Sequence, residues 1–487
     1  MSRLFIRLSI AVLALVALVG MFYPAFWWTL VVIGPLVLLG LRDMFQTRHT
    51  ILRNFPVIGH LRYFFEFISP EIQQYFIERH TDGTPISRNR RRIVYQRAKE
   101  TNDTHAYGTE LDLYDPKYEG LKHSIYPAKR LEQPPRVTIG NDQCRQPYSA
   151  ALLNISGMSY GALSRNAVMA LNQGARMGGF YHNTGEGGLS EYHLGGGGDL
   201  VWQIGTGYFS CRTAQGEFDP GQFKANAAHP QVKMIELKLS QGAKPGSGGI
   251  LPAKKNTPDI ARVRGIKPYA TVYSPPAHAT FEDADGLVQF VQRLRDLSGG
   301  KPVGLKLCIG SREEFIELCH AMASADIYPD FITVDGAEGG TGAAPLEFSD
   351  SVGMPLEPAL RFVDETLKHQ GLRQRIKLIA SGKVISAVSL IKMLALGADL
   401  CNSARAFMLS LGCIQALRCN TNQCPTGVTT QNPQLVQGLV VEDKKFRVAN
   451  FHKNTLERAL DLLAASGVAR LEDLSPRIFM YGSEWHP

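Results

Sequence analysis

The stretch Phe331-Ile-Thr-Val-Asp-Gly-Ala-Glu-Gly-Gly-Thr-Gly342 joins a short β-rich run to a glycine-rich loop. Apolar and β-branched residues in a run of this length favour a strand, and the glycines that follow indicate a turn. A β-rich run followed by a glycine-rich turn recurs along the chain beyond Tyr148, and segments with helical patterns lie between these runs. This alternation is typical of parallel α/β folds.

Nine runs have the composition of strands, and segments of helical periodicity lie between them. The candidate strands are Ala151–Ile155, Gly179–His182, Val201–Ile204, Met234–Lys238, Ala270–Tyr273, Val303–Leu307, Phe331–Val334, Lys377–Ala380 and Asp399–Asn402. The candidate helices are Gly161–Met177, Ala284–Leu297, Arg312–Ala323, Leu356–His369 and Ser386–Leu396. We predict an α/β fold, a (β/α)8 TIM barrel in which one of the nine runs is a loop strand. A doubly wound sheet also alternates, but no G-x-G-x-x-G motif follows an early strand here.

Short loops, three of which contain glycine, follow several of the predicted strands. They are Gly205-Thr-Gly-Tyr208, Asp335–Gly342, Ser381-Gly-Lys383 and Ser403-Ala-Arg405. A barrel gathers its chemistry at the carboxyl ends of its strands, and the loops after strands seven and eight often bind phosphate. Glycine lets backbone amides approach an anion closely. The position of these loops therefore indicates a cofactor that carries phosphate.

Lys306 interrupts the apolar run Val303–Leu307. A charge that points into a barrel needs an anionic partner, whereas a lysine on the outer face would reach solvent along its own stem. Its place near the end of the strand favours a cofactor contact.

Three further charged side chains lie on or near glycine loops: Glu186, Lys244 and Arg264. An ammonium holds a substrate carboxylate as a point charge, and a guanidinium holds it with two hydrogen bonds. Most glutamates are solvated surface groups, so Glu186 alone indicates little. The histidines His182, His193 and His278 are scattered singly and predict no metal site.

Three of the eight cysteines, Cys413, Cys419 and Cys424, lie within a dozen residues, and a proline follows the last of them. Thiolates bind iron, and a trailing proline is common where a chain turns around an iron–sulfur cluster. Three ligands point to a cluster with one vacant corner, of the three-iron type. The alternative is a set of buried core cysteines, which the polar run Asn420–Gln423 makes less favourable. The triplet predicts a redox enzyme.

The segment Leu8–Leu41 carries no formal charge. As one helix it would be about 51 Å long, well beyond a hydrocarbon core of roughly 30 Å. The run breaks near Tyr23-Pro24-Ala25, so we expect two transmembrane helices that form a hairpin. Arginines precede and follow the pair, which predicts that both ends face the cytoplasm. The expected location is the cell (inner) membrane, with the catalytic domain on the cytoplasmic side; the alternative is a cleaved signal peptide that ends near Gly20.

The net charge is +8, and much of the basic excess lies near the N-terminus. The run Arg88, Arg90, Arg91 and Arg92 fits a segment held against an anionic membrane face. No stacking module or DNA-reading motif accompanies it, so nucleic acid is not an expected partner. The cysteines outside the triplet have no disulfide-scaffold spacing, which favours a reducing compartment. We divide the chain into a hairpin anchor (1–42), a mostly helical or irregular adaptor (43–147), a barrel domain (148–440) and a C-terminal helical extension (441–487).

Several of these motifs, in this order, resemble the FMN-binding synthase domain of glutamate synthase. They are Ser156-Gly-Met-Ser-Tyr-Gly-Ala-Leu163, Asn183-Thr-Gly-Glu-Gly-Gly188, Gln241-Gly-Ala-Lys-Pro-Gly246, Tyr273-Ser-Pro-Pro-Ala-His278, Gly339-Gly-Thr-Gly-Ala343 and the cysteine triplet. The resemblance covers about residues 148–440 and implies a barrel with FMN at its strand ends and a [3Fe-4S] cluster beside it. The implied reaction forms L-glutamate from 2-oxoglutarate and ammonia.

The resemblance also implies roles for individual residues, which fall into four groups. FMN would contact Met158, Ser159, Gln203, Lys306, Gly340, Thr341, Gly382, Lys383, Ser403 and Ala404. The oxo acid would be held by Gln241, Lys244 and Arg264. Glu186, with Lys244, would take part in catalysis, the carboxylate accepting a proton during imine formation. The cluster would be bound by Cys413, Cys419 and Cys424.

The chain departs from the family pattern in three respects. It has no glutaminase-like segment, so ammonia would be free or delivered by another protein. It has Ser247 and Ile250 where the family usually has Glu and Gln. It has no nucleotide-binding module for NADPH, so electrons would come from ferredoxin, a reductase subunit or a membrane carrier. Two alternatives stay open: an FMN oxidoreductase on another 2-oxo or 2-hydroxy acid linked to a membrane quinone, and a non-catalytic barrel subunit of a membrane redox complex.

Overall fold

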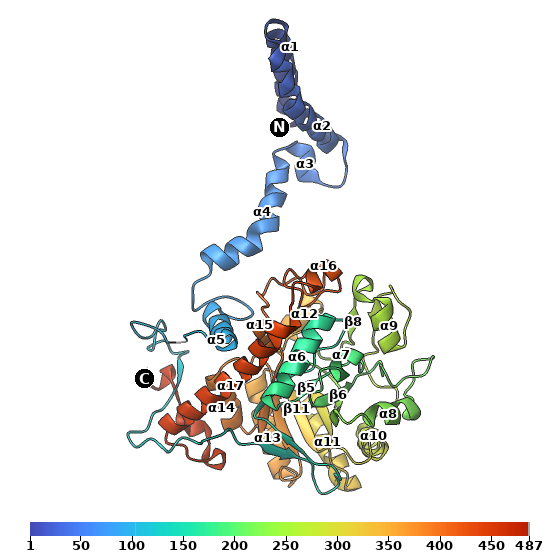
Figure 1. Ribbon diagram of the computed structural model, residues 1–487, viewed down its shortest axis with the longest axis vertical. Coiled ribbons are helices and arrows are strands. Elements are labelled where there is room, and N and C mark those ends of the chain that lie inside the picture. Colours follow the sequence, from blue (N-terminus) through green and yellow to red (C-terminus); the bar gives the residue numbers. More distant parts are fainter. Residues whose placement is uncertain (103, 486–487) are drawn as a thin grey trace. The chain divides into compact units, whose positions relative to one another are not determined.

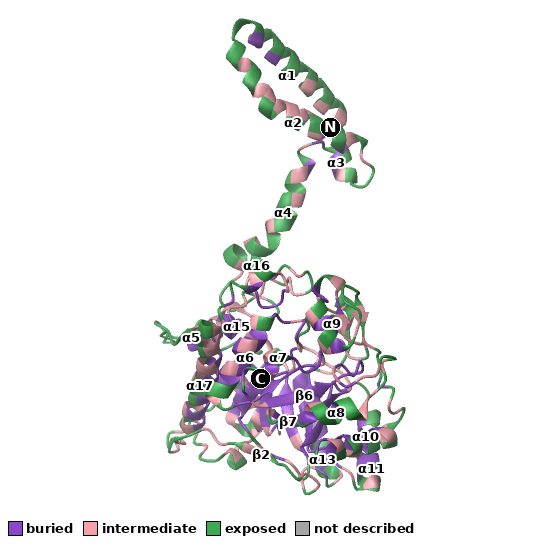
Figure 2. Ribbon diagram, turned by 45° about the vertical axis from the view of Figure 1, so that its right-hand side comes forward, coloured by how far each residue is buried: buried purple, intermediate pink, exposed green. Residues whose placement is uncertain are grey.

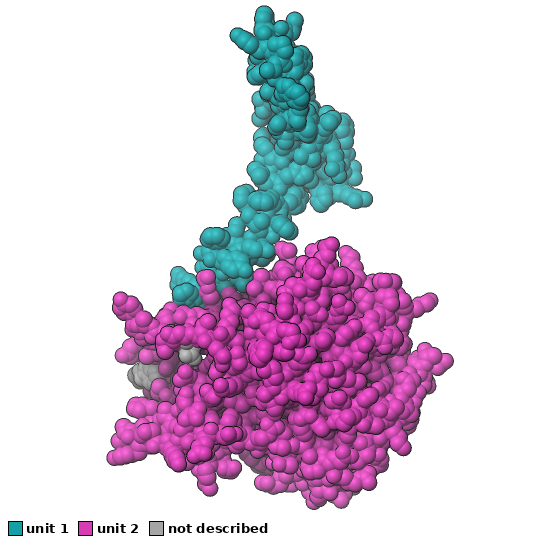
Figure 3. All heavy atoms as spheres, viewed as in Figure 1, with its two compact units in different colours: residues 1–83 teal, residues 84–487 magenta. Residues whose placement is uncertain are grey.

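The computed structural model describes residues 1–102 and 104–485. The chain forms two compact units, residues 1–83 and residues 84–487, which Figure 3 shows in different colours. Residue 103 of the predicted adaptor and the last two residues of the predicted extension lie outside the described part.

The larger unit is built on a closed barrel of eight parallel strands (Figure 1). In barrel order the strands are β4 (Leu153–Ile155), β5 (His182–Asn183), β6 (Leu200–Ile204), β7 (Val232–Lys238), β10 (Val303–Leu307), β11 (Phe331–Asp335), β12 (Lys377–Ser381) and β13 (Leu400–Ser403). Each pairs with the next, and β13 returns to β4. The predicted (β/α)8 barrel is confirmed.

The remaining one of the nine predicted runs, Ala270–Tyr273, contributes a short strand outside the barrel. This strand, β9 (Val272–Tyr273), pairs antiparallel with β8 (Ile250–Leu251) in the long connection between β7 and β10. The expectation of one loop strand among nine candidates is therefore correct.

Helices surround the barrel, and Figure 2 shows the buried strands inside them. They are α6 (Arg165–Gly178), α7 (Glu191–Leu194), α8 (Pro220–Ala227), α9 (Pro258–Arg264), α10 (Ala284–Leu297), α11 (Arg312–Ala325), α12 (Leu346–Ser351), α13 (Leu356–His369), α14 (Ala387–Ala395), α15 (Arg405–Ser410), α16 (Pro433–Val436) and α17 (Val441–Ala465). Side-chain caps set several starts: Ser164, Asp283 and Ser311 accept hydrogen bonds from backbone amides of the first turns of α6, α10 and α11.

A β-hairpin lies over the amino-terminal end of the barrel. Its strands are β2 (Val137–Ile139) and β3 (Tyr148–Ala150), and they pair antiparallel. Buried residues of the hairpin and of five strands, with Tyr181 just before β5, form one apolar cluster: Ile139, Ala150, Tyr181, Val201, Met234, Phe331, Ile379 and Leu400. The lower half of the barrel is therefore filled with side chains.

Residues on both sides of the predicted barrel domain pack within the larger unit. The helix α5 (Arg88–Lys99) contacts α15 and α17, and Asn454 donates a 2.9 Å hydrogen bond to the Arg97 carbonyl oxygen. The strand β1 (Glu119–Leu121) pairs with β14 (Phe479–Tyr481). Arg91, which the charge pattern places against a membrane, is buried in α5 and donates to the Ile86 carbonyl oxygen.

The smaller unit consists of apolar helices and a short connecting segment. They are α1 (Ser2–Phe22), the 3-10 turn η1 (Pro24–Thr29), α2 (Leu30–Phe45), α3 (Thr50–Asn54), α4 (Gly59–Ile72) and the π-helical turn η2 (Gln73–Ile77). Two segments, Ser2–Phe22 and Pro24–Phe45, are long and apolar enough to cross a membrane. Because only 11% and 6% of their most apolar windows are buried, they do not resemble the core helices of a soluble domain.

Candidate active site at the carboxyl ends of the barrel strands

The inward-facing residues of the barrel become polar toward the carboxyl ends of the strands. Along β7 the inward series is Met234, Glu236 and Lys238, and along β11 it is Phe331, Thr333 and Asp335. Successive side chains of a strand point to opposite faces, so every second residue enters the interior. The apolar cluster therefore forms a floor, and a polar layer lies above it.

A buried carboxylate organises this polar layer. Glu236 is 1% exposed and accepts hydrogen bonds from Gln203 at 2.6 Å, from Asn183 at 2.7 Å and from Thr333 at 2.7 Å. Gln203, a predicted flavin contact, is thus held by a residue that the sequence reasoning missed. The sequence contains one signal for Glu236. Glu236 and Lys238 are two residues apart in a predicted strand, so their side chains lie on the same face of it.

Glu186 and Lys238 form an ion pair at the upper rim. The Lys238 Nζ lies 3.0 Å from Glu186 Oε1 and donates a 2.6 Å hydrogen bond to Gln241 Oε1. Burial raises the pKa of Glu186, but the cations of Lys238, Lys244 and Arg264 outweigh it, and the net pKa lies below its usual value. Glu186 is therefore a carboxylate that is ready to accept a proton.

Lys244 lies beside this pair in the same cavity. Its side chain is buried, and its Nζ donates a 2.9 Å hydrogen bond to the Ala343 carbonyl oxygen. Burial lowers the pKa of Lys244 to about 8, although Glu186 acts in the opposite direction. Ile250 also lines the cavity. The Lys244 ammonium thus donates to a neutral carbonyl oxygen, and its charge is available to a substrate carboxylate.

Arg264 is placed differently from the other predicted substrate residues. It is 5% exposed, donates to the Tyr160 carbonyl oxygen at 3.1 Å and lies over the Phe209 ring at 4.9 Å. Burial lowers its pKa to about 10. Because it is not among the described residues that line the cavity, Arg264 lies behind the wall, and it acts electrostatically on Glu186.

Lys306 points into the barrel, as the predicted cofactor contact requires. Its Nζ lies 3.6 Å from Asp335 Oδ2, and the same oxygen accepts a 2.8 Å hydrogen bond from the backbone amide of Gly242. Gly242 must be glycine, because a Cβ there would lie 1.6 Å from the Gly336 carbonyl oxygen. This close approach brings the loops after β7 and β11 together over Lys306.

Two cations face each other where the loops after β11, β12 and β13 meet. Burial lowers the pKa of Lys383, and Arg405 lowers it further, while Glu338 acts in the opposite direction. Burial likewise lowers the pKa of Arg405. Mutual repulsion of these two half-buried cations leaves a place for an anion. Gly340 lies against this place, since a Cβ on it would stand 3.0 Å from Arg405.

The remaining predicted flavin residues lie around the same space. Those that line the cavity are Met158, Ser159, Gln203, Lys306, Gly340, Thr341, Gly382, Lys383, Ser403 and Ala404. The cavity has a volume of about 500 Å³, within the range of roughly 300–1,000 Å³ that small-molecule sites occupy. The donor set suits FMN: paired cations and glycines for a phosphate, and Gln203 and Lys306 on the floor for a polar ring. Arg405 belongs to this set and was missed as a site residue.

The three thiols of the predicted cluster lie in the wall of the same cavity. Cys413, Cys419 and Cys424 line it, and each acts electrostatically on another of the three. No His, Cys, Asp or Glu group of three forms a site for a single metal ion in the described part of the chain. A cluster is larger than one ion, so its ligands stand further apart.

The loop that carries the thiols has an unusual backbone. Gln415, Leu417 and Asn422 have φ angles of 58°, 55° and 64°, in the left-handed region that non-glycine residues rarely occupy. The Thr429 hydroxyl is buried beside this loop and acts as a hydrogen-bond donor on the thiols of Cys419 and Cys424. Uncommon backbone conformations are typical of loops shaped around a ligand, and a hydroxyl aimed at two sulfurs favours their thiolate form. The residues present therefore fit a cysteine-bound cluster.

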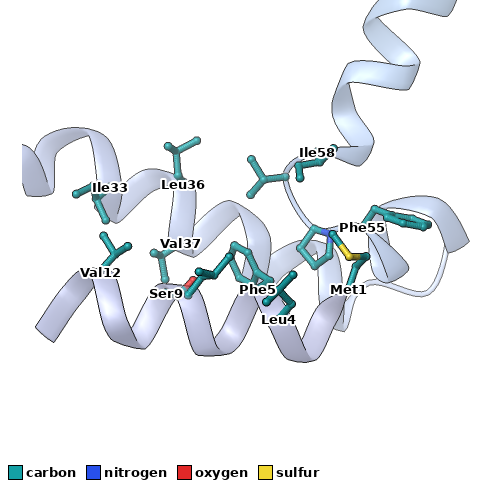
Figure 4. A pocket seen from close by; sticks show the side chains of 13 residues that line it. Met1, Leu4, Phe5, Ser9, Val12, Ile33, Leu36, Val37, Phe55 and Ile58 are labelled. Atoms are coloured by element: carbon teal, nitrogen blue, oxygen red, sulfur yellow. The ribbon is translucent and has the colours of Figure 1, made fainter. Parts of the chain in front are cut away.

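A second cavity lies within the smaller unit, between α1, α2 and the segment 55–58 (Figure 4). Its volume is about 320 Å³, and apart from Ser9 its lining side chains are apolar, with Val12 and Ile33 on facing helices. It offers no group for catalysis, so the chemistry of this chain lies in the barrel.

The fold and the site define a barrel enzyme with a cationic, glycine-lined cavity at its strand ends. Residues 91–469 match the family described as "Conserved region in glutamate synthase". The chain is 39% identical to the glutamate synthase large subunit-like protein YerD of Bacillus subtilis, over 89% of this chain and 90% of that protein. It is 36% identical to the archaeal glutamate synthase [NADPH] of Methanocaldococcus jannaschii, over 75% of this chain and 65% of that protein. It is 32% identical to the archaeal-type enzyme of Thermotoga maritima, over 73% and 63%.

The chain belongs to the glutamate synthase family and is an oxidoreductase of glutamate synthase type. The chain covers slightly less than two thirds of the length of the M. jannaschii and T. maritima proteins.

Proposed function

We propose that this chain binds FMN and a [3Fe-4S] cluster and forms L-glutamate from 2-oxoglutarate and ammonia. One observation carries the proposal: a single cavity is lined by Lys244 and Glu186 at one side, by Lys306 on its floor and by the three thiols at another side. The binding sites for the substrate carboxylate, the flavin ring and the iron–sulfur cluster would then lie next to one another.

The residues of the cavity provide the steps that the reaction needs. Lys244 would hold a substrate carboxylate as a point charge, and Gln241, fixed by Lys238, would orient it. Ammonia adds to the keto carbon, and water must leave before an imine exists. Glu186, kept ionised by its cationic neighbours, would accept the proton released when ammonia adds.

The reduced FMN, when bound, supplies the hydride that turns the imine into the amino acid. Lys306 would lie against the ring and offset negative charge on it, while Asp335 holds the ammonium in place. Arg405 and Lys383 would bind the phosphate. The closed floor of the barrel and the loop contacts over Lys306 would exclude water from the ring.

The direct test is an anaerobic assay of purified full-length protein with dithionite or reduced ferredoxin as the electron donor. The expected product from 2-oxoglutarate and ammonia is L-glutamate. Protein that contains flavin and cluster but forms no glutamate would refute the reaction.

The cluster has its own test in the Cys419→Ser variant. The wild-type protein should show flavin bands with a broad iron–sulfur shoulder, and the variant should lose the shoulder and its iron. The matched control is Cys144→Ser, because Cys144 lies in the connection between β2 and β3, away from the cavity. An unchanged shoulder in Cys419→Ser would disprove the ligand assignment.

A second candidate is an FMN oxidoreductase that acts on another 2-oxo or 2-hydroxy acid and exchanges electrons with a membrane quinone. Ile250, which lines the cavity near Lys244, favours it, since an isoleucine offers no hydrogen bond to a second carboxylate. Flavin reoxidation by a quinone analogue, without any need for ammonia, would support this candidate over the first.

We further propose that α1 and α2 cross the cell membrane as a hairpin and that the barrel lies on the cytoplasmic side. The length and apolar composition of both segments and the arginines that flank them support this topology. Full-length protein should stay in membranes washed with carbonate, and protease added to inverted vesicles should cleave the barrel. Release by the carbonate wash would contradict the anchor.

A further inference from the structure

Lys255 is a buried lysine outside the flavin site, on the connection between β8 and α9. It ends the 3-10 turn η3 (Ala253–Lys255), and its exposed fraction is 3%. Its Nζ donates hydrogen bonds to the Ala162 carbonyl oxygen at 2.6 Å and to the Cys419 carbonyl oxygen at 3.3 Å. These acceptors satisfy two of the three N–H groups of the ammonium but do not neutralise its charge.

Among the described residues no carboxylate forms an ion pair with Lys255. The acidic groups that act on it electrostatically are the thiols of Cys419 and Cys424, whereas Arg264 repels it. A buried ammonium without an anion is costly, so the charge needs a partner that the protein groups alone do not provide.

The Thr429 hydroxyl points to the same place. It is buried and acts as a hydrogen-bond donor on the sulfurs of Cys419 and Cys424, which counters the effect of burial and lowers the pKa of both thiols. An ammonium and a hydroxyl thus approach the same two sulfurs from different elements. Sulfur atoms that carry negative charge, as in a cluster bound by thiolates, would satisfy both groups.

Lys255 also joins the two halves of the site. Ala162 belongs to the loop after β4, which carries Met158 and Ser159 into the cavity, and Cys419 belongs to the thiol loop. Gln431 strengthens the same junction, since its side-chain amide donates to the carbonyl oxygens of Gly161 and Leu163. One side chain therefore connects the loop beside the flavin ring with the loop that would hold the cluster.

We propose that Lys255 is a positioning residue that serves as the counter-charge of the cysteine-bound cluster and raises its reduction potential. The inference rests on the proposed function for the presence of the cluster. A fixed positive charge stabilises the form of the cluster that has gained one electron, so the equilibrium of that one-electron reduction shifts toward the reduced state. The electron comes from the external donor and passes on to the flavin, and Lys255 itself gains or loses no atom.

The test is a redox titration of the full-length holoenzyme, followed by electron paramagnetic resonance, for wild type and Lys255→Met. Methionine keeps most of the side-chain volume and removes the charge. We expect the reduction equilibrium constant of the cluster to fall at least tenfold, which is 59 mV for a one-electron couple. The matched control is Lys254→Met, because Lys254 is the preceding residue and its side chain is exposed; its potential should equal that of wild type.

Two further variants test the proposal if Lys255→Met does not fold or does not bind iron. Lys255→Gln keeps a donor for the two carbonyl oxygens without the charge and should also show the lowered potential. Lys255→Arg keeps a charge and should recover most of the wild-type potential or iron content. A Lys255→Met or Lys255→Gln protein that holds the cluster at the wild-type potential would overturn the proposal.

Iron and acid-labile sulfide content separates this inference from the proposed reaction. Wild-type protein without iron and sulfide would overturn both the role of Lys255 and the cluster assignment. A cluster with a Lys255-dependent potential in a protein that forms no glutamate would leave the inference standing and refute the reaction.

Discussion

The Lys238 ammonium lies 3.0 Å from the Glu186 carboxylate, and the two residues come from strands that are not adjacent in the barrel. Lys238 ends β7, and Glu186 follows β5. Removing one partner of a buried ion pair leaves the other charge uncompensated. The protonation state of Glu186 therefore depends on Lys238, a residue that the sequence analysis did not assign to the site.

Replacing Lys238 with methionine should shift the acid limb of activity to higher pH. In wild type the pKa of Glu186 is held below its usual value, so its carboxylate form persists as the pH falls. Without Lys238, burial dominates, the pKa of Glu186 rises, and the base is lost at a higher pH. We expect kcat/KM near neutral pH to fall by about 10²-fold. The measurement is a pH profile of kcat/KM.

Lys233→Met is the control for that variant. Lys233 lies on the same strand, but its side chain is 38% exposed, and its ion-pair partner is Asp199 at 3.7 Å. Its pH profile should match wild type. An unshifted acid limb in Lys238→Met would show that Glu186 is not the group that titrates.

Glu236→Gln should destabilise the barrel, although it changes one atom. The carboxylate accepts three hydrogen bonds, from Gln203, Asn183 and Thr333. An amide there loses the negative charge that strengthens the bonds from Gln203 and Asn183, and its NH₂ group forces the Thr333 hydroxyl to accept a hydrogen bond instead of donating one. We expect the free energy of unfolding to fall by about 1–2 kcal/mol. Urea denaturation measures it, and the exposed Glu217→Gln serves as the control; equal stabilities would contradict the role of Glu236 in organising the layer.

Much of the barrel could be predicted from local patterns. The predicted runs Val303–Leu307 and Ala284–Leu297 coincide with β10 and α10, because apolar periodicity and caps define them within the sequence. Ala270–Tyr273 has the same local composition but forms β9 outside the barrel. Composition alone does not distinguish these cases, since barrel membership depends on pairing between distant segments.

The sequence predicted which residues lie in the cavity better than it predicted the contacts between them. The motifs bring Met158, Lys306 and Gly340 into one cavity, as the resemblance implies. Glu236 and Arg405 were missed because each matters through partners on other strands and loops, which no local spacing reveals. The resemblance implies that Arg264 holds the substrate, and in the structure its guanidinium is buried against Phe209 and is not among the described residues that line the cavity.

Arg405→Gln should weaken the binding of FMN without unfolding the protein. Arg405 and Lys383 lie close enough to repel each other, and a phosphate between them would relieve that repulsion. Losing one charged hydrogen-bond donor costs about 2 kcal/mol of binding free energy, or roughly 30-fold in Kd. Fluorescence titration of the flavin-free protein measures this Kd. Arg361→Gln, an exposed change on α13, is the control, and an unchanged Kd in Arg405→Gln would place the phosphate elsewhere.

The pKa of Lys244 predicts an alkaline limit on substrate binding. Burial lowers this pKa to about 8, so the side chain is an ammonium below that pH and a neutral amine above it. The KM for a 2-oxo acid should therefore be constant up to about pH 7.5 and rise up to tenfold per pH unit beyond pH 8. In Lys244→Gln the KM should be raised about tenfold or more at pH 7 and should no longer depend on pH in this range. Steady-state kinetics between pH 6.5 and 9.5 provide the measurement, and Lys267→Gln, an exposed lysine change, should retain the wild-type profile. A variant Lys244→Gln that keeps both the low KM and its alkaline rise would show that a different cation holds the carboxylate.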